Sequence, residues 1–326
     1  MSEPILPPLA GERRAFMQYR RLGQTDLNIS VIGFGASPLG GVFGPSDAVE
    51  GIRAVHLAIG EGINFFDVSP YYGLTLAEER LGQALTGRRD KVVLSTKCGR
   101  YGLNQFDFSG KRVRLGVEES LKRLRTDHVD LLLAHDVEFG NVEQIVADTI
   151  PVMRRLQEEG KTRYIGISGY PLKVLMNIAE QVPVDSILSY CRYNLLIDDM
   201  DTALTPFAER LGIGLINAAP LHMGMLTEGG APDWHPAPPE VRLAVREALD
   251  FCRKQNVDLP DLALRFCFDY PRVTSTLVGM STIEQVHRNL RAIRTPADPE
   301  LVSQVKAILA PAANIVWPSG RPENHD

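Results

Sequence analysis

The sequence predicts an α/β fold, a single (β/α)8 barrel, and three observations carry this prediction. Eight short apolar runs bounded by turn residues recur along the chain. Amphipathic stretches of helical character lie between them. The runs are apolar throughout instead of alternating with polar residues, which suits parallel strands buried on both faces. Eight strands, each followed by a helix, favour a closed barrel of ordinary length for that fold.

Each element can be placed in order. Residues 19–30 predict a hairpin of two short strands around Gly-Gln-Thr-Asp. The expected barrel strands then cover residues 31–35, 63–67, 92–96, 129–134, 164–168, 186–190, 213–217 and 275–279. The clearest helical stretches are residues 48–62, 113–125 and 151–161. The Gly- and Pro-rich residues 225–240 follow the seventh strand, and because such loops form the active face of a barrel, we expect this one to cover a ligand.

The alternative fold is a doubly wound parallel sheet. It would usually show a G-x-G-x-x-G turn after a strand, but Gly33, Gly35 and Gly40 do not have that spacing. No Pro-, Gly- or Ser-rich linker interrupts the body of the chain. We therefore expect one domain at residues 19–316, a flexible tail at residues 1–18 and a C-terminal tail at residues 317–326.

Composition excludes several classes of function. The 326 residues include 40 acids and 35 bases, for a net charge of -5, which is not the basic surplus of a nucleic-acid-binding protein. No apolar run reaches the ~20 residues that span a bilayer, and the N-terminal residues lack the apolar core of a signal peptide. We expect a cytoplasmic protein, a monomer or weak homo-oligomer, with no membrane partner. The cysteines lack CxxC spacing and predict neither a disulfide framework nor a metal site.

Four polar side chains stand at or just after successive strand ends. Asp67 ends the second strand, Tyr72 follows in its loop, Lys97 ends the third and His135 ends the fourth. Any one of them alone is explained as well by capping, packing or solvation. In a barrel, however, polar residues at the carboxyl ends of strands converge on one place. Together they predict an active site.

These groups fit the transfer of a proton to or from a carbonyl or alcohol oxygen. A phenol has a pKa near ~10, and a neighbouring ammonium lowers it. We therefore expect Lys97 to hold the pKa of Tyr72 below its free value, Asp67 to hold Lys97, and His135 to orient the substrate oxygen. Tyr72 would be the general acid/base.

The stretches "FFDVSPYYG", "STKCG" and "DLLLAHD" resemble the Asp, Tyr, Lys and His motifs of the aldo-keto reductase superfamily, in the same order, over residues 19–293. The resemblance implies a TIM barrel whose bottom is capped by the N-terminal hairpin, and a nicotinamide cofactor bound without a Rossmann domain. By matching position, Asp67, Tyr72, Lys97 and His135 would be the catalytic tetrad. The five-residue step from Asp67 selects Tyr72 over Tyr71.

The same resemblance implies the cofactor positions. Ser168 matches a carboxamide-binding residue, whereas Gly169, Tyr190 and Ala218 replace the Asn, Gln and stacking aromatic that are usual in the family. Tyr190 is a candidate to pack against the nicotinamide instead. Backbone amides of residues 279–282 and the following helix N-terminus would receive phosphate. The implied cofactor-binding residues are Gly35, Asp67, Ser168, Tyr190, Ala218, Pro220, Leu221, Gly224, Leu226, Gly279, Met280, Ser281, Thr282, Gln285 and Asn289.

The motifs "DVSPYYG", "SYCRYNLL" and "APLHMGML" resemble the sugar dehydrogenase branch of this superfamily. That resemblance implies oxidation of an aldose of the L-galactose, L-fucose or D-arabinose type at C1 to its lactone. An NADPH-dependent aldehyde or ketone reductase would use the same tetrad in the other direction, and a non-catalytic cofactor-sensing subunit is a third possibility. NAD is expected over NADP because residues 278–286 contain no basic side chain, although Arg288 could reach a 2′-phosphate.

Overall fold

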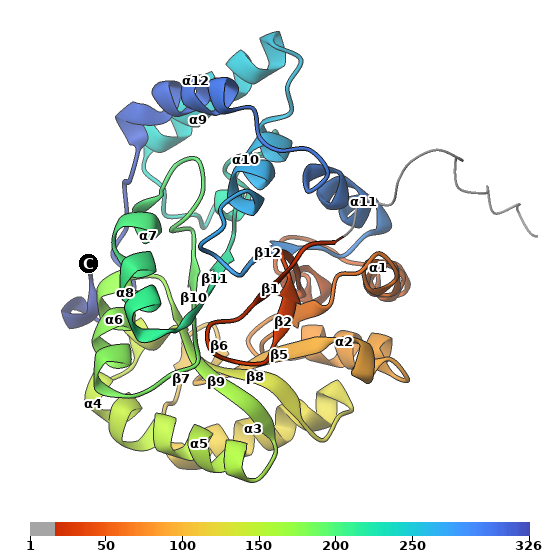
Figure 1. The fold of residues 1–326 in the computed structure, drawn as a ribbon, viewed down its shortest axis with the longest axis vertical. Helices are drawn as coiled ribbons and strands as arrows, with labels where there is room; N and C mark the ends of the chain where they lie inside the picture. The colour runs from red at the N-terminus through yellow and green to blue at the C-terminus, as the bar shows by residue number, and fades with distance from the viewer. Residues whose placement is uncertain (1–16) are drawn as a thin grey trace, which may run out of the picture.

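The computed structural model describes residues 17–326, and its centre is a closed barrel of parallel strands. Strands that follow one another along the chain are neighbours around the barrel, which closes between β12 and β3 (Figure 1). The prediction of a (β/α)8 barrel is confirmed. The barrel strands are β3 (Ile32–Gly35), β4 (Phe65–Asp67), β5 (Val93–Cys98), β8 (Val129–His135), β9 (Thr162–Gly169), β10 (Ser186–Tyr190), β11 (Gly214–Ala218) and β12 (Ser275–Gly279).

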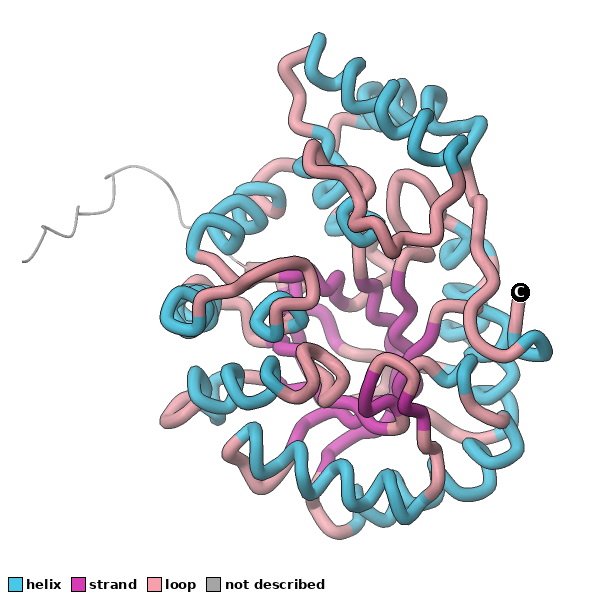
Figure 2. Tube along the Cα trace, turned by 180° about the vertical axis from the view of Figure 1, so that it is seen from behind, coloured by secondary structure: helices cyan, strands magenta, loops and turns pink. Residues whose placement is uncertain are grey.

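Helices surround the strands on all sides of the barrel (Figure 2). Those that follow the eight barrel strands in turn are α1 (Ala48–Gly60), α2 (Leu76–Leu85), α3 (Gly110–Leu124), α5 (Ile150–Glu158), α6 (Leu172–Gln181), α8 (Leu204–Leu211), α10 (Leu259–Phe268) and α11 (Ile283–Ala292). The additional helices are α4 (Val142–Gln144), α7 (Asp199–Thr202), α9 (Pro239–Lys254) and α12 (Pro299–Leu309).

The apolar strands divide their side chains between two cores. Phe65, Leu131, Leu133 and Ile216 belong to the cluster that fills the inside of the barrel. Their neighbours along the strands, such as Leu132, belong to the larger cluster shared with the helices. Because side chains alternate along a strand, a strand that is buried on both faces is mostly apolar along its whole length, with small hydroxyl side chains as the main buried exceptions. This is the physical origin of the continuous apolar runs in the sequence.

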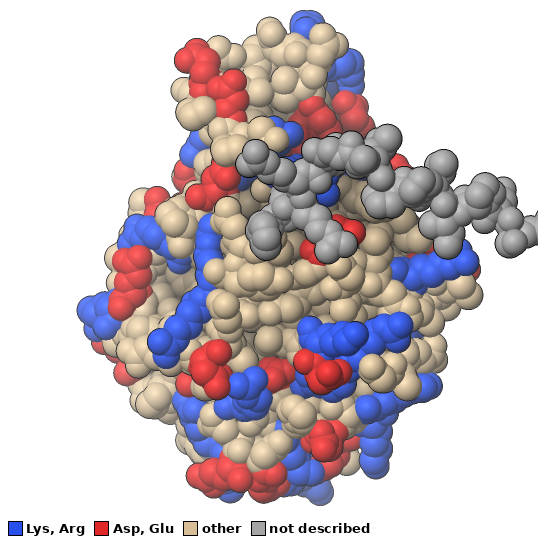
Figure 3. Space-filling view, turned by 45° about the vertical axis from the view of Figure 1, so that its right-hand side comes forward, with Lys and Arg blue, Asp and Glu red and all other residues tan. Residues whose placement is uncertain are grey.

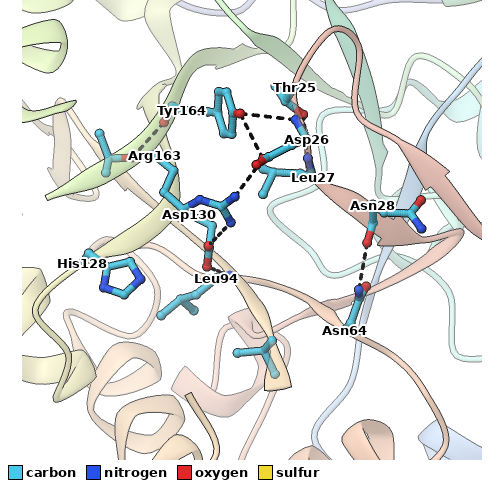
Figure 4. A network of polar contacts seen from close by, with 12 residues as sticks. Thr25, Asp26, Leu27, Asn28, Asn64, Leu94, His128, Asp130, Arg163 and Tyr164 are labelled. Carbon is cyan, nitrogen blue, oxygen red and sulfur yellow. Dashed lines mark hydrogen bonds and ion pairs between the residues drawn. The ribbon is translucent and has the colours of Figure 1, made fainter. Parts of the chain in front are cut away.

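The N-terminal hairpin consists of β1 (Tyr19–Arg21) and β2 (Asn28–Ser30), paired antiparallel as expected. Asp26 in its turn accepts hydrogen bonds from Arg163 Nη2 at 2.7 Å and from the Tyr164 hydroxyl at 3.0 Å (Figure 4). Arg163 Nη1 in turn bonds Asp130 at 2.9 Å. Asp130 and Arg163 stand at the beginnings of β8 and β9, so the hairpin closes the end of the barrel opposite the strand C-termini.

Three helices form an extension beside the barrel. Helices α9, α10 and α12 contribute most of a second apolar cluster, which also includes residues 195–197 from the loop after β10. They lie together at the top of Figure 1. The expected loop at residues 225–240 leads from β11 into α9, and its Trp234 ring lies 6.3 Å from that of Phe43 in the loop after β3. Loops after the two strands that flank β12 therefore meet.

Residues 317–326, here called the C-terminal segment, pack against loops of the barrel. The Trp317 ring stacks on Tyr170 at 4.2 Å. Asn324 Nδ2 donates to the carbonyl oxygen of Glu138 at 2.8 Å. Asp326 forms an ion pair with Arg192, whose side chain is 2% exposed. The C-terminal segment thus joins the loops that follow β8, β9 and β10.

The described surface bears charges of both signs. In Figure 3, Lys and Arg side chains alternate with Asp and Glu on the face shown, and no extended basic area forms there. Within residues 17–326, no helix has the length and apolar character that crossing a bilayer requires. The expectation for residues 1–18 falls almost wholly outside the described residues.

Candidate active site

A buried ion pair lies at the centre of the strand C-termini. Asp67 ends β4 and Lys97 lies near the end of the neighbouring β5, so the barrel register brings their side chains together. Lys97 Nζ forms an ion pair with Asp67 and donates to the carbonyl oxygen of Val68 at 2.9 Å. Burial lowers the pKa of Lys97, but Asp67 and Tyr72 together outweigh this effect and the pKa is raised. Lys97 therefore remains an ammonium.

Tyr72 lies beside this pair, with the centre of its ring 4.8 Å from Lys97 Nζ. Burial raises the pKa of its phenol to about 12, against the lowering effect of Lys97 and with a further rise from Asp67. Our expectation of a pKa below the free value is therefore wrong in this structure. Lys97 does lower the pKa, but Asp67 neutralises much of its charge, and burial disfavours the phenolate.

His135 provides the third polar group. Its Nδ1 lies 3.0 Å from the Ser69 hydroxyl, which also accepts the backbone N–H of Tyr71 at 3.1 Å. A hydroxyl that accepts from Tyr71 can donate to Nδ1, which leaves the proton of the imidazole on Nε2. Burial lowers the pKa of His135 well below 6.5, with help from Lys97 and Arg100. His135 is therefore a neutral donor through Nε2.

The raised pKa of Tyr72 makes a prediction for its expected role, in which the phenolate would be the base in the oxidation of an alcohol. Because the phenol loses its proton only at high pH, log kcat/KM is expected to rise by about one unit per pH unit between pH 7 and pH 9. Lys97→Met removes the positive charge, raises the pKa further and lowers the rate at pH 7. Lys91→Met, at an exposed position near the start of β5, serves as the control. A wild-type rate already constant from pH 7 upward would contradict this mechanism.

A second charged pair lies next to His135. Asp136 forms an ion pair with Arg100, at the start of the small hairpin β6 (Arg100–Gly102) and β7 (Gln105–Phe106). The Arg100 guanidinium lies 3.7 Å from the centre of the Tyr71 ring. Tyr71, the tyrosine next to Tyr72, therefore packs against Arg100. Sequence reasoning missed Arg100 and Asp136. The only signal was an acid directly after His135.

The departures at residues 169 and 190 are connected through Glu138, which sequence reasoning also missed. The Glu138 side chain is buried, and its Oε1 accepts from the Tyr190 hydroxyl at 3.3 Å, the Tyr170 backbone N–H at 3.2 Å and the Ser319 hydroxyl at 3.2 Å. A Cβ atom on Gly169 would lie 2.6 Å from Glu138 Oε2. Burial and the neighbouring Asp136 raise the pKa of Glu138 to about 8. Glu138 therefore occupies the space of a side chain at residue 169 and holds the Tyr190 hydroxyl.

Two of the expected cofactor contacts are buried polar groups without a partner. Ser168 Oγ, and both amide atoms of Asn289 in α11, make no hydrogen bond within the described part of the chain. Leaving such a group unpaired costs about 1–3 kcal/mol, so each calls for an explanation, such as a ligand. Ser168 lies one residue before the end of β9 and would suit a carboxamide, and Asn289 would suit an adenine. Both residues fit a nicotinamide dinucleotide.

The expected phosphate segment is already hydrogen-bonded internally. Gln285 Oε1 accepts the backbone N–H groups of Ser281 at 2.7 Å and Thr282 at 3.2 Å, completing a capping box at the start of α11. The N–H of Met280 donates to the carbonyl oxygen of Gly35. The N–H of Ile283 donates to the Glu50 carboxylate at 2.9 Å. A phosphate would have to displace these acceptors, because the amides are not free.

The remaining cofactor positions lie around the C-terminal ends of the strands and stay predictions. Gly35 and Gly279 end the neighbouring strands β3 and β12, and Ala218 ends β11 beside Tyr190 on β10. The short turn after β11 carries the others, namely Pro220, Leu221, Gly224 and Leu226. Leu226 and Pro220 are buried, whereas Ala218 and Gly224 are partly exposed.

Comparison with known proteins decides the family. The model of the Aldo/keto reductase family matches residues 31–310. The chain belongs to the aldo-keto reductase family. The resemblance inferred from its motifs is therefore confirmed.

This aldo-keto reductase is similar to several characterised proteins. It is 46% identical to L-galactose dehydrogenase of Arabidopsis thaliana, over 94% of this chain and 99% of the relative. It is 32% identical to D-arabinose 1-dehydrogenase of Saccharomyces cerevisiae, over 82% of this chain and 87% of the relative. Among solved structures, the holo form of an aldo-keto reductase from Bacillus halodurans matches with a TM-score of 0.76 and 28% identity, covering 93% of this chain and 98% of that one.

Proposed function

We propose that this aldo-keto reductase is an aldose 1-dehydrogenase that oxidises a sugar of the L-galactose, L-fucose or D-arabinose type at C1 to its lactone. The observation that carries the proposal is the 46% identity to an L-galactose dehydrogenase over nearly the whole of both chains. The arrangement of Tyr72, Lys97 and His135 supports it, because these groups provide a base, a fixed positive charge and a neutral donor at one place.

In this mechanism each side chain acts on the C1 hydroxyl. The Tyr72 phenolate takes the hydroxyl proton, while Lys97 stabilises the phenolate and Asp67 holds Lys97 in place. His135 donates from Nε2 to the same oxygen and orients it. A bound nicotinamide cofactor, with Ser168 as a residue that would hold its carboxamide, would supply the acceptor for the hydride that leaves C1. In the opposite direction the same phenol would protonate a carbonyl oxygen, which is the chemistry of the alternative aldehyde or ketone reductase.

We further propose NAD as the preferred cofactor. The 2′-phosphate of NADP carries about -1.5 to -2 charges if it resembles other phosphate monoesters. At the first turn of α11, the amide of Ile283 is already bonded to the Glu50 carboxylate, and Glu284 is exposed beside it. Arg288 is partly buried and lies close enough to Asp258 for its charge to act there, although burial and Asp261 still raise the pKa of Asp258. The two acids disfavour the additional 2′-phosphate of NADP, and Arg288, one turn further along α11, is the base that would oppose them.

The experiment measures kcat/KM for L-galactose, L-fucose, D-arabinose and simple aldehydes with both cofactors. We expect oxidation of at least one of these sugars, and a higher kcat/KM with NAD than with NADP. Glu50→Gln is expected to raise kcat/KM with NADP relative to NAD by about 5- to 20-fold, on the order of 1–2 kcal/mol of removed repulsion.

Glu158→Gln, which removes an exposed acid from α5, is the matched control for charge and should leave the ratio unchanged. Wild-type preference for NADP would overturn the cofactor proposal. Activity confined to aldehyde reduction would favour the reductase alternative.

A further inference from the structure

We propose that the pair formed by Arg100 and Asp136 recognises the C2 hydroxyl of the aldose, with Asp136 Oδ1 as the hydrogen-bond acceptor. This inference rests on the proposed function, because it requires a sugar whose C1 oxygen is held by Tyr72 and His135. It assigns a role in substrate specificity to two residues outside the tetrad.

The position of Asp136 places an acceptor beside the reacting centre. Asp136 follows His135 directly, and its Oδ1 lies 3.6 Å from His135 Nε2, the atom that would hold the C1 oxygen. This separation is too long for a direct hydrogen bond. Its side chain is 3% exposed, and Oδ1 has no hydrogen-bond partner in the described part of the chain. An unpaired buried carboxylate oxygen is costly, and a donor from the substrate would satisfy it.

Arg100 fixes the carboxyl group in this position. Its Nη1 forms an ion pair with Asp136 Oδ2, which leaves Oδ1 for another donor. Its Nη2 donates to the carbonyl oxygen of Leu103 at 3.3 Å, and its guanidinium lies over the Tyr71 ring. These contacts hold the guanidinium from three sides. A fixed guanidinium prevents the carboxyl group from rotating away, so the acceptor is held before the substrate arrives.

The chemistry of a pyranose selects one hydroxyl. The C1 carbon has two neighbours in the ring, C2 and the ring oxygen. The ring oxygen has no proton to donate, whereas C2 carries a hydroxyl. Burial raises the pKa of Asp136, but the paired Arg100 guanidinium opposes this rise and favours the carboxylate, which can only accept. Asp136 Oδ1 lies next to His135 Nε2, the atom that would donate a hydrogen bond to the C1 oxygen. The hydroxyl that Oδ1 can reach is therefore the one on the neighbouring carbon. The pair of Arg100 and Asp136 therefore recognises the hydroxyl on C2.

A purely structural ion pair would explain only part of this arrangement. The contact of Arg100 with Asp136 Oδ2 ties the hairpin of β6 and β7 to the loop after β8. That contact needs one carboxylate oxygen, and it does not account for the burial of Oδ1 next to the catalytic imidazole. The two explanations differ in whether a change at Asp136 depends on the sugar's C2 hydroxyl.

The first measurement uses the wild-type enzyme alone. It compares kcat/KM for L-galactose and 2-deoxy-L-galactose with NAD. Hydrogen bonds to charged groups contribute enough to produce about 10- to 150-fold discrimination, and a site built to bind a hydroxyl rejects the analogue that lacks it. We expect L-galactose to be preferred by at least tenfold. Equal values for the two sugars would overturn the inference while leaving the proposed function intact.

The second measurement uses Asp136→Asn, which keeps the size of the side chain and tolerates the left-handed backbone at this residue, where φ is 53°. We expect kcat/KM for L-galactose to fall by about 10- to 100-fold, with 2-deoxy-L-galactose changed by less than about threefold. Discrimination between the sugars is thereby lost. A variant that slows both sugars equally, or neither, would show a structural role and overturn the inference.

Asp130→Asn is the matched control. Asp130 is also a buried acid paired with arginines, Arg89 and Arg163, but it lies at the opposite end of the barrel. This control should lower the Tm and keep the preference for L-galactose over its 2-deoxy analogue. Failure of the wild type to oxidise any aldose would overturn the proposed function and this inference together, which distinguishes that outcome from equal use of the two sugars.

Discussion

Tyr72→Phe is expected to lower kcat for aldose oxidation by about 10²–10⁴-fold, the usual contribution of a general acid/base group. The substitution removes only the ionisable hydroxyl beside Lys97 and keeps the ring that packs edge-on to His135 at 5.8 Å. Because the hydroxyl acts on the reaction barrier, the dissociation constant of NADH should change by only a few-fold. Stopped-flow turnover and NADH fluorescence titration measure the two quantities separately.

Tyr71→Phe is the control for this variant. The Tyr71 ring supports the Arg100 guanidinium through its face, and this contact does not need the hydroxyl. We expect a change of less than about threefold in kcat, as for substitutions away from the chemistry. If Tyr72→Phe retained more than a tenth of the wild-type kcat, another group would have to be the acid/base residue.

Deleting residues 318–326 is expected to destabilise the enzyme strongly. Arg192 is fully buried and shares its charge between Asp199 and Asp326, so the deletion removes one of its two carboxylates. Removing a partner from a buried ion pair costs about 3–5 kcal/mol, which corresponds to a Tm lower by roughly 4–8 °C for a chain of this size. The deletion also removes the Ser319 and Asn324 contacts to Glu138, so kcat/KM should fall as well.

Single substitutions separate these effects. Asp326→Asn tests the ion pair, and Ser319→Ala tests the contact with Glu138. Glu323→Gln, which alters an exposed ion pair with Arg321 in the same segment, should leave the Tm unchanged. A deletion variant with wild-type Tm and wild-type kcat/KM would show that the C-terminal segment supports neither the fold nor the site.

The barrel and the four central residues could be predicted because both depend on local patterns. A strand buried on both faces is mostly apolar, so a charged or ionisable residue at its carboxyl end is visible in the sequence. Asp67 and His135 end β4 and β8, and Lys97 is the residue before the last in β5. The order of the strands then follows from the closed parallel topology, which brings the ends together without any information about the loops.

The pKa of Tyr72 and the site roles of Arg100, Asp136 and Glu138 could not be predicted, because they depend on the paths of loops and not on local sequence patterns. How deeply a phenol is buried depends on the paths of the loops above it, and here burial outweighs the Lys97 charge. Glu138 is recognisable only through Gly169, Tyr190 and Ser319, which are distant in the sequence. The small hairpin that carries Arg100 also lies in a stretch without a strong apolar pattern.

The contact between Glu138 and Asn324 joins residues that are 186 positions apart in the chain. A ribosome adds roughly 5–20 residues per second, so about 10–40 s pass between the synthesis of one partner and that of the other. During this interval the loop that carries Glu138 has left the ribosome without the groups that later enclose it. In a nascent chain whose strands are mostly synthesised, the loop that carries Glu138 is therefore still exposed to chaperones and proteases.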